Sequence, residues 1–404
     1  MQGMTNDERA VLERAAGEPM LDQVTDWAAV NSGSRNLDGL AAMAAIYADA
    51  FAALPGELAL KESSPVEAMQ ANGSLKPVRH GCNLHVKVRP EAPVQLVFTG
   101  HMDTVFGVDH PFQDVFWREK HKVLGGPGVA DMKGGIAVML AALKAVEASA
   151  AAQSLGYEIV INSDEEVGSP GSAALLAEAA RDKKAALTYE PAALPDGTLA
   201  GARPGSGNFS IFIQGRSAHA GRNPEDGRNA IVAAADLALR LARAKSDGLS
   251  VNPARIDGGG PNNVVPDHAV LRINMRPVDA EKQRRGQAAL GEAVAGVAAE
   301  HDVKIHVHGG FGRPPKPVDP QAEKLFELVR RCGANLGQEI SWRATGGVCD
   351  GNNIAACGVP VVDTMGVRGG AIHSSDEYLI VESLAERAQL SALTVLRLAS
   401  GAPL

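Results

Sequence analysis

The sequence predicts an α/β protein with a central mixed sheet flanked by helices, into which a second, smaller α+β domain is inserted. Three observations predict this architecture. Apolar runs typical of strands alternate with helix-length segments from about residue 95 onward. The alternation is interrupted at the Gly/Pro cluster GARPGSG near residue 201 and resumes after GRPPKP at 312–317. A chain of 404 residues is also too long for one compact core, so two domains are expected.

The first part of the chain alternates strands with helices. The predicted elements are a strand at 94–100, a helix at 134–151, a strand at 157–161, a helix at 172–184 and a strand at 185–191. The run YEIVI at 157–161 is β-branched and aromatic, as buried strands usually are. The alternation predicts βαβ units, and the carboxyl ends of such strands are the usual place for a site.

The inserted segment differs from the first part of the chain in the order of its predicted elements and in its lack of polar motifs after the strands. Its predicted elements are an alternating strand within 201–215, a helix at 227–244, a strand at 268–276, a helix at about 280–300 and a strand at 302–309. After the return linker we predict a helix at 319–335, a buried strand at 358–366 and a last helix at about 382–399. Because the inserted elements lack the polar motifs found after the other strands, we interpret them as a separate domain.

Composition excludes several classes of function. The formal net charge is −8 and there is no basic tract, which argues against a nucleic-acid partner. The charged N-terminus lacks the apolar segment of a secretory signal, and no apolar stretch reaches 18 residues. The cysteines lack zinc-knuckle spacing and are interpreted as free buried thiols: Cys82, Cys332, Cys349 and Cys357. We therefore expect a cytoplasmic protein with no membrane partner.

Histidine, aspartate and glutamate residues collect after the apolar runs or in glycine-rich loops. Five stretches show this: FTGHMDTV (98–105), GGPGVADMKGG (125–135), NSDEEVG (162–168), TYEP (188–191) and AIHSSDEYL (371–379). One His-x-Asp alone is more commonly a turn feature than a ligand pair. Five such stretches in one sheet bring together carboxylates that repel one another unless cations hold them.

The residue types indicate which cation to expect. Imidazole and carboxylate ligands together suit zinc, with cobalt or manganese as substitutes. A two-metal site needs a bridging carboxylate and about four further ligands. The candidates that supply this number are His101, Asp131, Glu166, Glu190 and His373.

The ordered set GHMDTV, GVADMKGG, SDEEVGS, EP, SAHAG, NNVVP, GG and HSSDEY resembles the motifs of the cocatalytic-zinc metallopeptidase and deacylase family. This family includes glutamate carboxypeptidase, acetylornithine deacetylase and succinyl-diaminopimelate desuccinylase. The likeness covers about residues 20–400 and is nearest to the bacterial glutamate carboxypeptidases. It implies a metal-binding catalytic domain at 1–201 and 315–404, a lid and dimerisation domain at 202–314, and a homodimer.

The resemblance also implies two zinc ions per subunit. Asp131 would bridge them, His101 and Glu190 would complete one site, and Glu166 and His373 would complete the other. In this family a glutamate at the position of Glu190 accompanies carboxypeptidases and deacylases, whereas an aspartate there accompanies aminopeptidases.

Two further residues next to the ligands are given roles by the resemblance. Glu165 would be the general base that takes a proton from the attacking water and returns it to the leaving amine. Asp103 would orient His101 as a supporting carboxylate. We expect an extended segment, in which Glu165 and Glu166 point to opposite sides, toward the substrate and the metals. Asp164 is expected to serve only a turn or a cap.

Other residues would contact the substrate. His219, in GRSAHAG, would reach across a dimer and stabilise the oxyanion in the partner's active site. The resemblance gives Asn263, Arg276 and Gly347 as substrate contacts, and Arg313 as a second guanidinium suited to an acidic side chain. Without the resemblance, an arginine on an exposed strand is usually a solvated charge and a lone histidine a surface or core residue.

The leading hypothesis is zinc-dependent hydrolysis of an amide bond in a small peptide or N-acyl amino acid with a free carboxylate. A glutamate-type carboxypeptidase comes first, an N-acyl amino acid deacylase second and a dipeptidase third. A binding protein without turnover would belong to a different class of function. The sequence argues against it, because all five candidate metal ligands and Glu165 are present. In TGGVCDGNN (345–353), Cys349 replaces the threonine of the carboxypeptidases, which leaves the exact substrate open.

Overall fold

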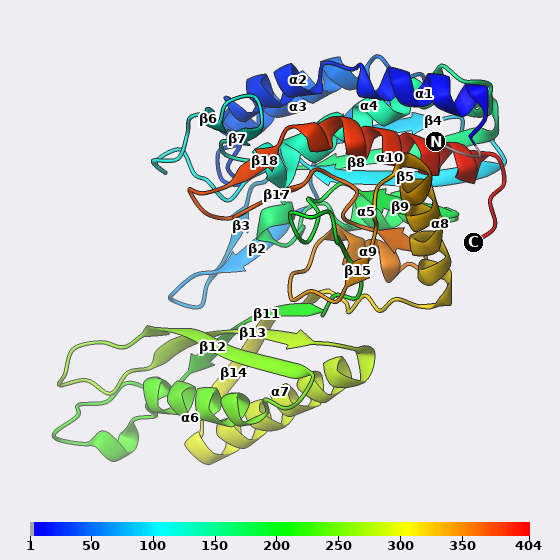
Figure 1. The fold of residues 1–404 in the computed structure, drawn as a ribbon. Helices are drawn as coiled ribbons and strands as arrows, with labels where there is room; N and C mark the ends of the chain where they lie inside the picture. The colour runs from blue at the N-terminus through cyan, green and yellow to red at the C-terminus, as the bar shows by residue number, and fades with distance from the viewer. Residues whose placement is uncertain (1–3) are drawn as a thin grey trace.

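A six-stranded mixed sheet forms the centre of the computed structural model, which describes residues 4–404 (Figure 1). Its strands, in spatial order, are β1 (Glu57–Lys61), β4 (Asn83–Val88), β8 (Leu155–Asn162), β5 (Val94–His101), β9 (Ala185–Thr188) and β16 (Val361–Val362). Strands β8, β5, β9 and β16 run parallel, and β4 is antiparallel to both of its neighbours. The predicted fold class, a mixed sheet flanked by helices, is confirmed.

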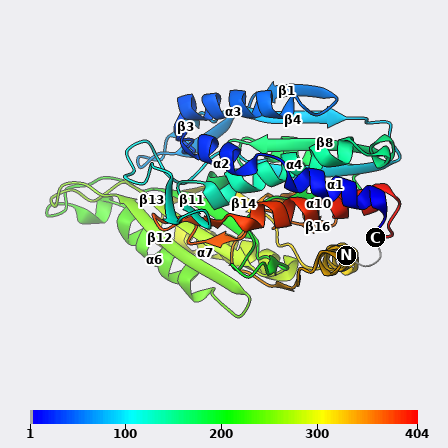
Figure 2. The ribbon, with the colours of Figure 1, turned by 45° about the horizontal axis from the view of Figure 1, so that its top comes forward.

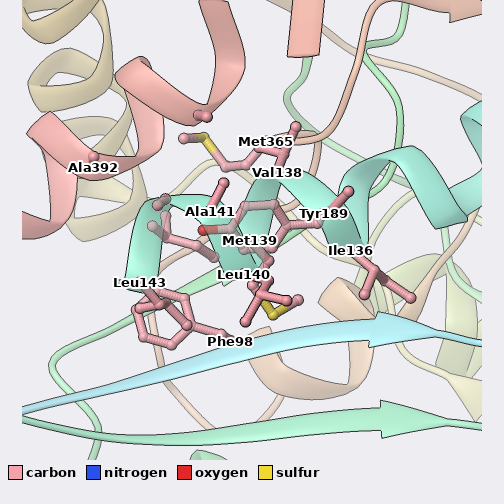
Figure 3. Close-up of a cluster of buried hydrophobic side chains, with 14 of the residues drawn as sticks. Phe98, Ile136, Val138, Met139, Leu140, Ala141, Leu143, Tyr189, Met365 and Ala392 are labelled. Carbon is pink, nitrogen blue, oxygen red and sulfur yellow. The ribbon is translucent and has the colours of Figure 1, made fainter. Parts of the chain in front are cut away.

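Alternate residues of the central strands pack into different hydrophobic clusters. Leu96 and Phe98 of β5 belong to a large cluster with α4 (Gly135–Glu147) and α10 (Glu382–Ala399). Figure 3 shows Phe98 beneath α4, with a residue of α10 on the other side of that helix. Val97 faces the opposite way, into a smaller cluster with α5 (Ala173–Ala180) and α9 (Asp350–Ala355). Because both faces are covered, the strands are held firmly and their ends are fixed in space.

Further helices complete the layer over the α4 face. They are α1 (Asn6–Ala16), α2 (Met20–Ala28), α3 (Leu37–Phe51) and α8 (Pro320–Leu336); the opposite face carries α5 (Ala173–Ala180) and α9 (Asp350–Ala355). A second small sheet contains β17 (Gly369–Gly370), β18 (Tyr378–Ile380), β7 (Val123–Gly125) and β6 (Phe116–Glu119). Since β18 pairs with β7, the loop before β18 lies beside the loop after β7.

The inserted segment forms an antiparallel sheet of its own. Its strands, in spatial order, are β12 (Leu249–Gly258), β13 (His268–Pro277), β11 (Ser206–Gln214) and β14 (Lys304–Arg313). Helices α6 (Ala230–Arg243) and α7 (Ala280–His301) cover the face that points away from the central sheet (Figures 1 and 2). Its hydrophobic cluster is separate from the central ones. That residues 202–314 act as a lid and dimerisation domain stays a prediction.

A hairpin from the N-terminal part reaches this second sheet. The hairpin consists of β2 (Val66–Met69) and β3 (Leu75–Val78). Arg272 of β13 donates to the Met69 carbonyl oxygen at 2.9 Å, and the Nε2 of His308 lies 3.1 Å from the Glu67 carbonyl oxygen. The inserted sheet is therefore held by the β2–β3 hairpin as well as by the two segments through which the chain enters and leaves it.

Several sequence predictions need correction. The strand predicted at 358–366 is only two residues long, Val361–Val362. The segment after YEIVI is not extended, because Glu165–Val167 forms a 3-10 turn. The helices predicted at 134–151, 319–335 and 382–399 are present as α4, α8 and α10.

Within residues 4–404, no helix combines the length and the apolar character that a membrane span requires. The cytoplasmic location is not tested by this finding and stays a prediction.

We predict that Phe98→Ala lowers the free energy of unfolding by about 3–5 kcal/mol, because it empties a site deep in the core. The Phe98 side chain is fully buried, and its ring lies 5.5 Å from that of Tyr157 in an edge-on contact. Leu60→Ala on the edge strand β1, where the side chain is 45% exposed, should change stability by less than about 0.5 kcal/mol. Urea titration followed by circular dichroism checks both; equal losses would contradict the assignment of the core.

Candidate metal centre

Three neighbouring parallel strands end at the candidate site. His101 is the last residue of β5, Glu165 and Glu166 follow β8, and Glu190 follows β9. Adjacent strands lie roughly 4.8 Å apart, so side chains at equivalent ends come within reach of one another. His101 pairs in register with Asn162, the last residue of β8. The topology of the sheet therefore brings these polar residues together.

Asp131 and His373 come from two loops outside the central sheet. Asp131 lies between β7 and α4, and the Asp131–Met132 peptide bond is cis. A Cβ atom on Gly135 would lie 1.9 Å from the Tyr189 carbonyl oxygen, so only glycine lets α4 begin this close to the end of β9. His373 lies between β17 and β18. The pairing of β18 with β7 carries it to Asp131.

Asp131 stands between two histidines. Its Oδ1 lies 3.1 Å from the Nε2 of His101, and its Oδ2 lies 3.3 Å from the Nε2 of His373. The Nε2 of His101 is 3.8 Å from a Glu190 oxygen, and that of His373 is 3.1 Å from a Glu166 oxygen. The site thus consists of two half-sites, each with one imidazole and one carboxylate, that share Asp131.

Ligand-type atoms in this cluster are close enough to hold ions. Those of His101, Asp131 and Glu166 lie within 4.8 Å of one another, and so do those of His101, Glu165 and Glu190. The second group includes Glu165, which the sequence assigned to proton transfer and not to a metal. All five residues predicted as ligands are brought together, while their individual roles stay predictions.

The carboxyl groups of the cluster are poorly accommodated as bare anions. Burial raises the pKa of Glu165 to about 8. Burial, followed by the charge of Asp131, raises the pKa values of Glu166 and Glu190 to about 7. Hydrogen bonds to Asp131 and Glu166 raise the pKa of His373 to about 11. Imidazole nitrogens among crowded, buried carboxylates are a donor set that fits divalent cations, with zinc foremost.

Asp103 supports the cluster from behind. The Nδ1 of His101 lies 2.9 Å from the Asp103 carbonyl oxygen, so a proton on Nδ1 leaves Nε2 free for a metal. The Asp103 carboxylate lies farther away, at 3.5 Å, and accepts hydrogen bonds from the backbone amides of Glu165 and Glu166 and from the Ser34 hydroxyl. Asp103 thus holds both the histidine and the Glu165–Glu166 turn.

The turn itself is fastened by Asp164. Its buried carboxylate accepts the Gly171 amide at 2.6 Å and the Ser172 hydroxyl at 2.5 Å, and its carbonyl oxygen accepts the Ser169 amide. The expectation that Glu165 and Glu166 diverge along an extended segment is therefore wrong. They occupy one helical turn, and the expected turn role of Asp164 is confirmed.

Glu377 supports the Asp131 loop, and sequence reasoning did not assign it a role. Its buried carboxylate accepts the backbone amides of Gly128 at 3.1 Å, Ala130 at 2.9 Å and Asp131 at 3.0 Å. The available signal was its place in HSSDEY, four residues after His373. A carboxylate that satisfies three amides fixes the loop that presents Asp131.

A cleft of about 440 Å³ opens beside the cluster. Its walls include Asp131, Glu165, Glu166, Glu190 and His373, together with Arg203, Gly347 and Cys349. The sequence reasoning also missed Arg203, since nothing in its spacing marked it. The Arg203 guanidinium donates to Asp363 at 2.7 Å, and the Lys316 ammonium lies 3.2 Å from the same carboxylate. Two buried cations therefore share one anion at this wall.

Arg313 lies behind Glu165 and does not line the cleft. Its guanidinium is 2.7 Å from the Glu165 carboxylate, donates to the Glu165 carbonyl oxygen at 2.9 Å, and is 3.4 Å from Asp350. Only 6% of Arg313 is exposed, so its charge is committed to internal partners. Its expected contact with the substrate stays a prediction; the observed contacts favour the positioning of Glu165.

The remaining predicted residues are distributed differently. Gly347 lines the cleft, whereas His219, Asn263 and Arg276 do not. His219 and Asn263 are exposed in the inserted segment, on two loops joined by a backbone hydrogen bond. Arg276 donates to the Gly346 carbonyl oxygen at 3.0 Å, one residue from the cleft wall. The roles of these residues toward the substrate stay predictions.

The chain is similar to known hydrolases in sequence and in fold. It matches the Peptidase family M20/M25/M40 over residues 97–397. Carboxypeptidase G2 from Pseudomonas sp. (strain RS-16) is 31% identical over 333 residues, which cover 80% of this chain and 78% of that protein. A succinyl-diaminopimelate desuccinylase from Pseudomonas syringae pv. tomato is 27% identical over 331 residues, 76% of this chain and 83% of that protein. The solved structure of aminopeptidase PepT from Bacillus cereus, 23% identical, shares the fold with a TM-score of 0.70 over 96% of this chain and 99% of that one.

We predict that Glu377→Gln weakens metal binding by about 10–100-fold while the protein stays folded. A glutamine offers one acceptor oxygen, so one of the three amides now held by Glu377 would face an NH₂ group. Competition with a chromogenic chelator measures the affinity.

The matched control for this prediction is the neighbouring Asp376→Asn. The Asp376 side chain is 80% exposed and touches only Arg118, a surface pair of small energetic value. Unchanged affinity in Glu377→Gln, or an equal fall in both variants, would contradict the role given to Glu377.

Proposed function

The chain belongs to the peptidase family M20/M25/M40, which confirms the resemblance drawn from its sequence, and on this premise we propose that it hydrolyses amide bonds with two bound zinc ions. The substrate is a small peptide or N-acyl amino acid with a free carboxylate, foremost one cleaved by a glutamate-type carboxypeptidase. The observation that carries the proposal is the pair of histidine–carboxylate half-sites that share Asp131 beside the buried Glu165.

The ligands divide between the two half-sites. His101 and Glu190 would hold one zinc ion, His373 and Glu166 would hold the other, and Asp131 would serve both. Zinc bound there would supply a Lewis acid that lowers the pKa of a water molecule. Cobalt or manganese would satisfy the same nitrogen and oxygen donors.

Glu165 moves the proton in this proposal. Its side chain is buried on the cleft wall, and its carboxylate lies within 4.8 Å of the ligand-type atoms of His101 and Glu190, next to the half-site that these two residues form. As general base it takes a proton from the attacking water, and it then returns the proton to the leaving amine nitrogen. Arg313 and the two amides that point to Asp103 hold this residue in place from behind.

The preference for a free carboxylate is supported by the charges on the cleft wall. Arg203 lines the cleft, and it shares Asp363 with Lys316, so two buried cations face one carboxylate at this wall. A guanidinium at the wall of a cleft is suited to a carboxylate of the substrate. The same wall would serve an N-acyl amino acid deacylase, the second candidate, which the desuccinylase relative favours.

We also propose that the protein is a homodimer in which residues 202–314 act as a lid. In this proposal His219 acts on the partner's active site. Support comes from its exposed position outside the cleft of its own chain, where it cannot reach the amide bond without movement or a second chain.

The experiment that tests the function is turnover of the zinc-loaded protein on N-acyl and peptidyl amino acids with varied C-terminal residues. Glu165→Gln should lower kcat by about 10²–10⁴-fold with the metal content unchanged, because it removes the proton acceptor. Metal content is measured by mass spectrometry. Fast cleavage of substrates that end in glutamate or aspartate supports the carboxypeptidase, and fast cleavage of short acyl groups supports the deacylase. No metal-dependent turnover on any member would overturn both.

We predict that His219→Ala lowers kcat by about 10²–10³-fold, as loss of an oxyanion donor does elsewhere, with unchanged metal content. Mixing this variant with Glu165→Gln should restore part of the activity, because each mixed dimer has one site with Glu165 and the partner's His219. The reassociated mixture is assayed after partial unfolding and refolding. Equal loss of metal, or no activity in the mixture, would refute the assignment.

A further inference from the structure

A second cavity, of about 400 Å³, lies between the inserted sheet and the segment that follows the Glu165–Glu166 turn. Val167 and Pro170, which follow Glu166, form one wall, and the β2–β3 hairpin forms another. The inserted sheet closes it with the polar side chains of Asn208, Ser210 and Asn274. No metal ligand lines this cavity, so it is separate from the cleft described above.

His80 lines this cavity and has no hydrogen-bonding partner. Its side chain is 1% exposed, and neither ring nitrogen makes a hydrogen bond within residues 4–404. The Asp164 carboxylate lies 3.8 Å from its Nδ1 but is already occupied by Gly171 and Ser172. A buried polar group without a partner is costly, and a ligand that supplies the partner removes the cost.

Arg35 lines the same cavity as His80. Its side chain makes no hydrogen bond or ion pair among the described residues. Its charge nevertheless reaches His80, because burial and then Arg35 lower the pKa of the imidazole. The ring is therefore neutral near pH 7 and has one N–H to donate. Glu67 is the only carboxylate on the cavity wall, and Arg272 there is bound to Asp257.

The position of these two residues connects the cavity to the chemistry. Arg35 follows Ser34, whose hydroxyl donates to the Asp103 carboxylate at 2.7 Å. Asp103 in turn accepts the amides of Glu165 and Glu166. Glu165 and Glu166 line the cleft, and Val167 and Pro170, which follow them, line the second cavity. An amide bond at the metal centre has two arms, and a cavity lies on each side.

We propose that Arg35 and His80 form an anion subsite that receives a carboxylate on the acyl or peptidyl arm of the substrate. This rests on the proposed function and narrows it to N-acyl amino acids or peptides with an anionic group on each side of the scissile bond. One anion meets the Arg203 wall, and the other meets Arg35 and the N–H of His80.

The test uses two substrates that differ in one group. N-glutaryl and N-glutaramyl amino acids have acyl arms of equal length, ending in a carboxylate or a neutral carboxamide. Wild type should prefer the carboxylate by about tenfold or more in kcat/KM, as charged hydrogen bonds allow. Arg35→Gln should remove that preference, because kcat/KM should fall for the glutaryl substrate and stay unchanged for the glutaramyl substrate. Arg35 is exposed, so this variant keeps the fold.

A matched control changes the opposite charge in the same cavity. Glu67→Gln removes the only carboxylate of the wall and should raise the preference for the glutaryl substrate. Its carbonyl oxygen, which faces His308, is unaffected by the substitution. Equal rates of wild type on both substrates, or equal falls on both in Arg35→Gln, would overturn the subsite.

Binding separates the failure of the subsite from that of the function. Calorimetry of the Glu165→Gln variant should show that the glutaryl substrate binds more tightly than the glutaramyl substrate. The double variant that also carries Arg35→Gln should bind both substrates equally. This result supports the subsite even if no substrate of the panel is turned over, an outcome that overturns the proposed function alone. If free glutarate or phosphate binds through Arg35 while wild type shows no preference between the substrates, the cavity is a site for a free anion and the assignment to the substrate is wrong.

Discussion

Mutual repulsion among buried carboxylates is the constraint on which the rest of the structure depends. Two neighbouring parallel strands, β8 and β9, end beside Asp131 and deliver Glu165, Glu166 and Glu190 to a place that is largely shielded from water. Such a cluster is tolerated only where cations neutralise it and where each carboxylate is held in one orientation. The two histidines on the two sides of Asp131 mark where the positive charge belongs.

Residues behind the cluster fix the orientation of its carboxylates. Two of them are carboxylates that accept hydrogen bonds from backbone amides, and a third is a buried arginine. The Asp103 carboxylate accepts hydrogen bonds from the amides of Glu165 and Glu166, and the Glu377 carboxylate accepts hydrogen bonds from three amides of the Asp131 loop. Both are acceptors with several donors, an arrangement that fixes a loop without adding a hydrophobic contact. Arg313 does the same for Glu165 with a charge. Precision at the site thus depends on residues that never touch the cleft.

The connection between the two sheets is electrostatic as well as covalent. The two segments through which the chain enters and leaves the inserted sheet pair with each other, since Arg203 and Lys316 exchange backbone hydrogen bonds at 2.8 and 3.0 Å. Both side chains form ion pairs with Asp363. Arg313 lies three residues before Lys316 and forms an ion pair with Glu165. A movement of the inserted sheet would therefore displace Glu165, the proposed general base. In the proposed function, this connection links closure of residues 202–314 over the substrate to the alignment of Glu165.

Sequence reasoning predicted the residues that the structure brings together at the candidate metal centre because their signals are local. His101 and Glu190 follow apolar strands directly, so strand periodicity and residue type are sufficient. It failed where long-range contacts decide the outcome. The turn at Glu165 is helical because Asp164 binds amide and hydroxyl groups up to eight residues ahead, which no periodicity reveals. Arg313 likewise shows only a charge in the sequence, and its partner is 148 residues away.

The distribution of the remaining residues bears on how the site is completed. One chain supplies the candidate ligands, the proposed base and Arg203 around the cleft, but His219 and Asn263 lie on exposed loops away from it. Arg276 stops at the Gly346 carbonyl oxygen, next to the wall. In the proposed function a developing oxyanion needs a hydrogen-bond donor, and among the described residues none on the strands of the inserted sheet lines the cleft of one chain. In that proposal, closure of residues 202–314 or a loop from a second copy supplies the donor. The loops that carry His219 and Asn263 are joined to each other by a backbone hydrogen bond, so they would arrive together.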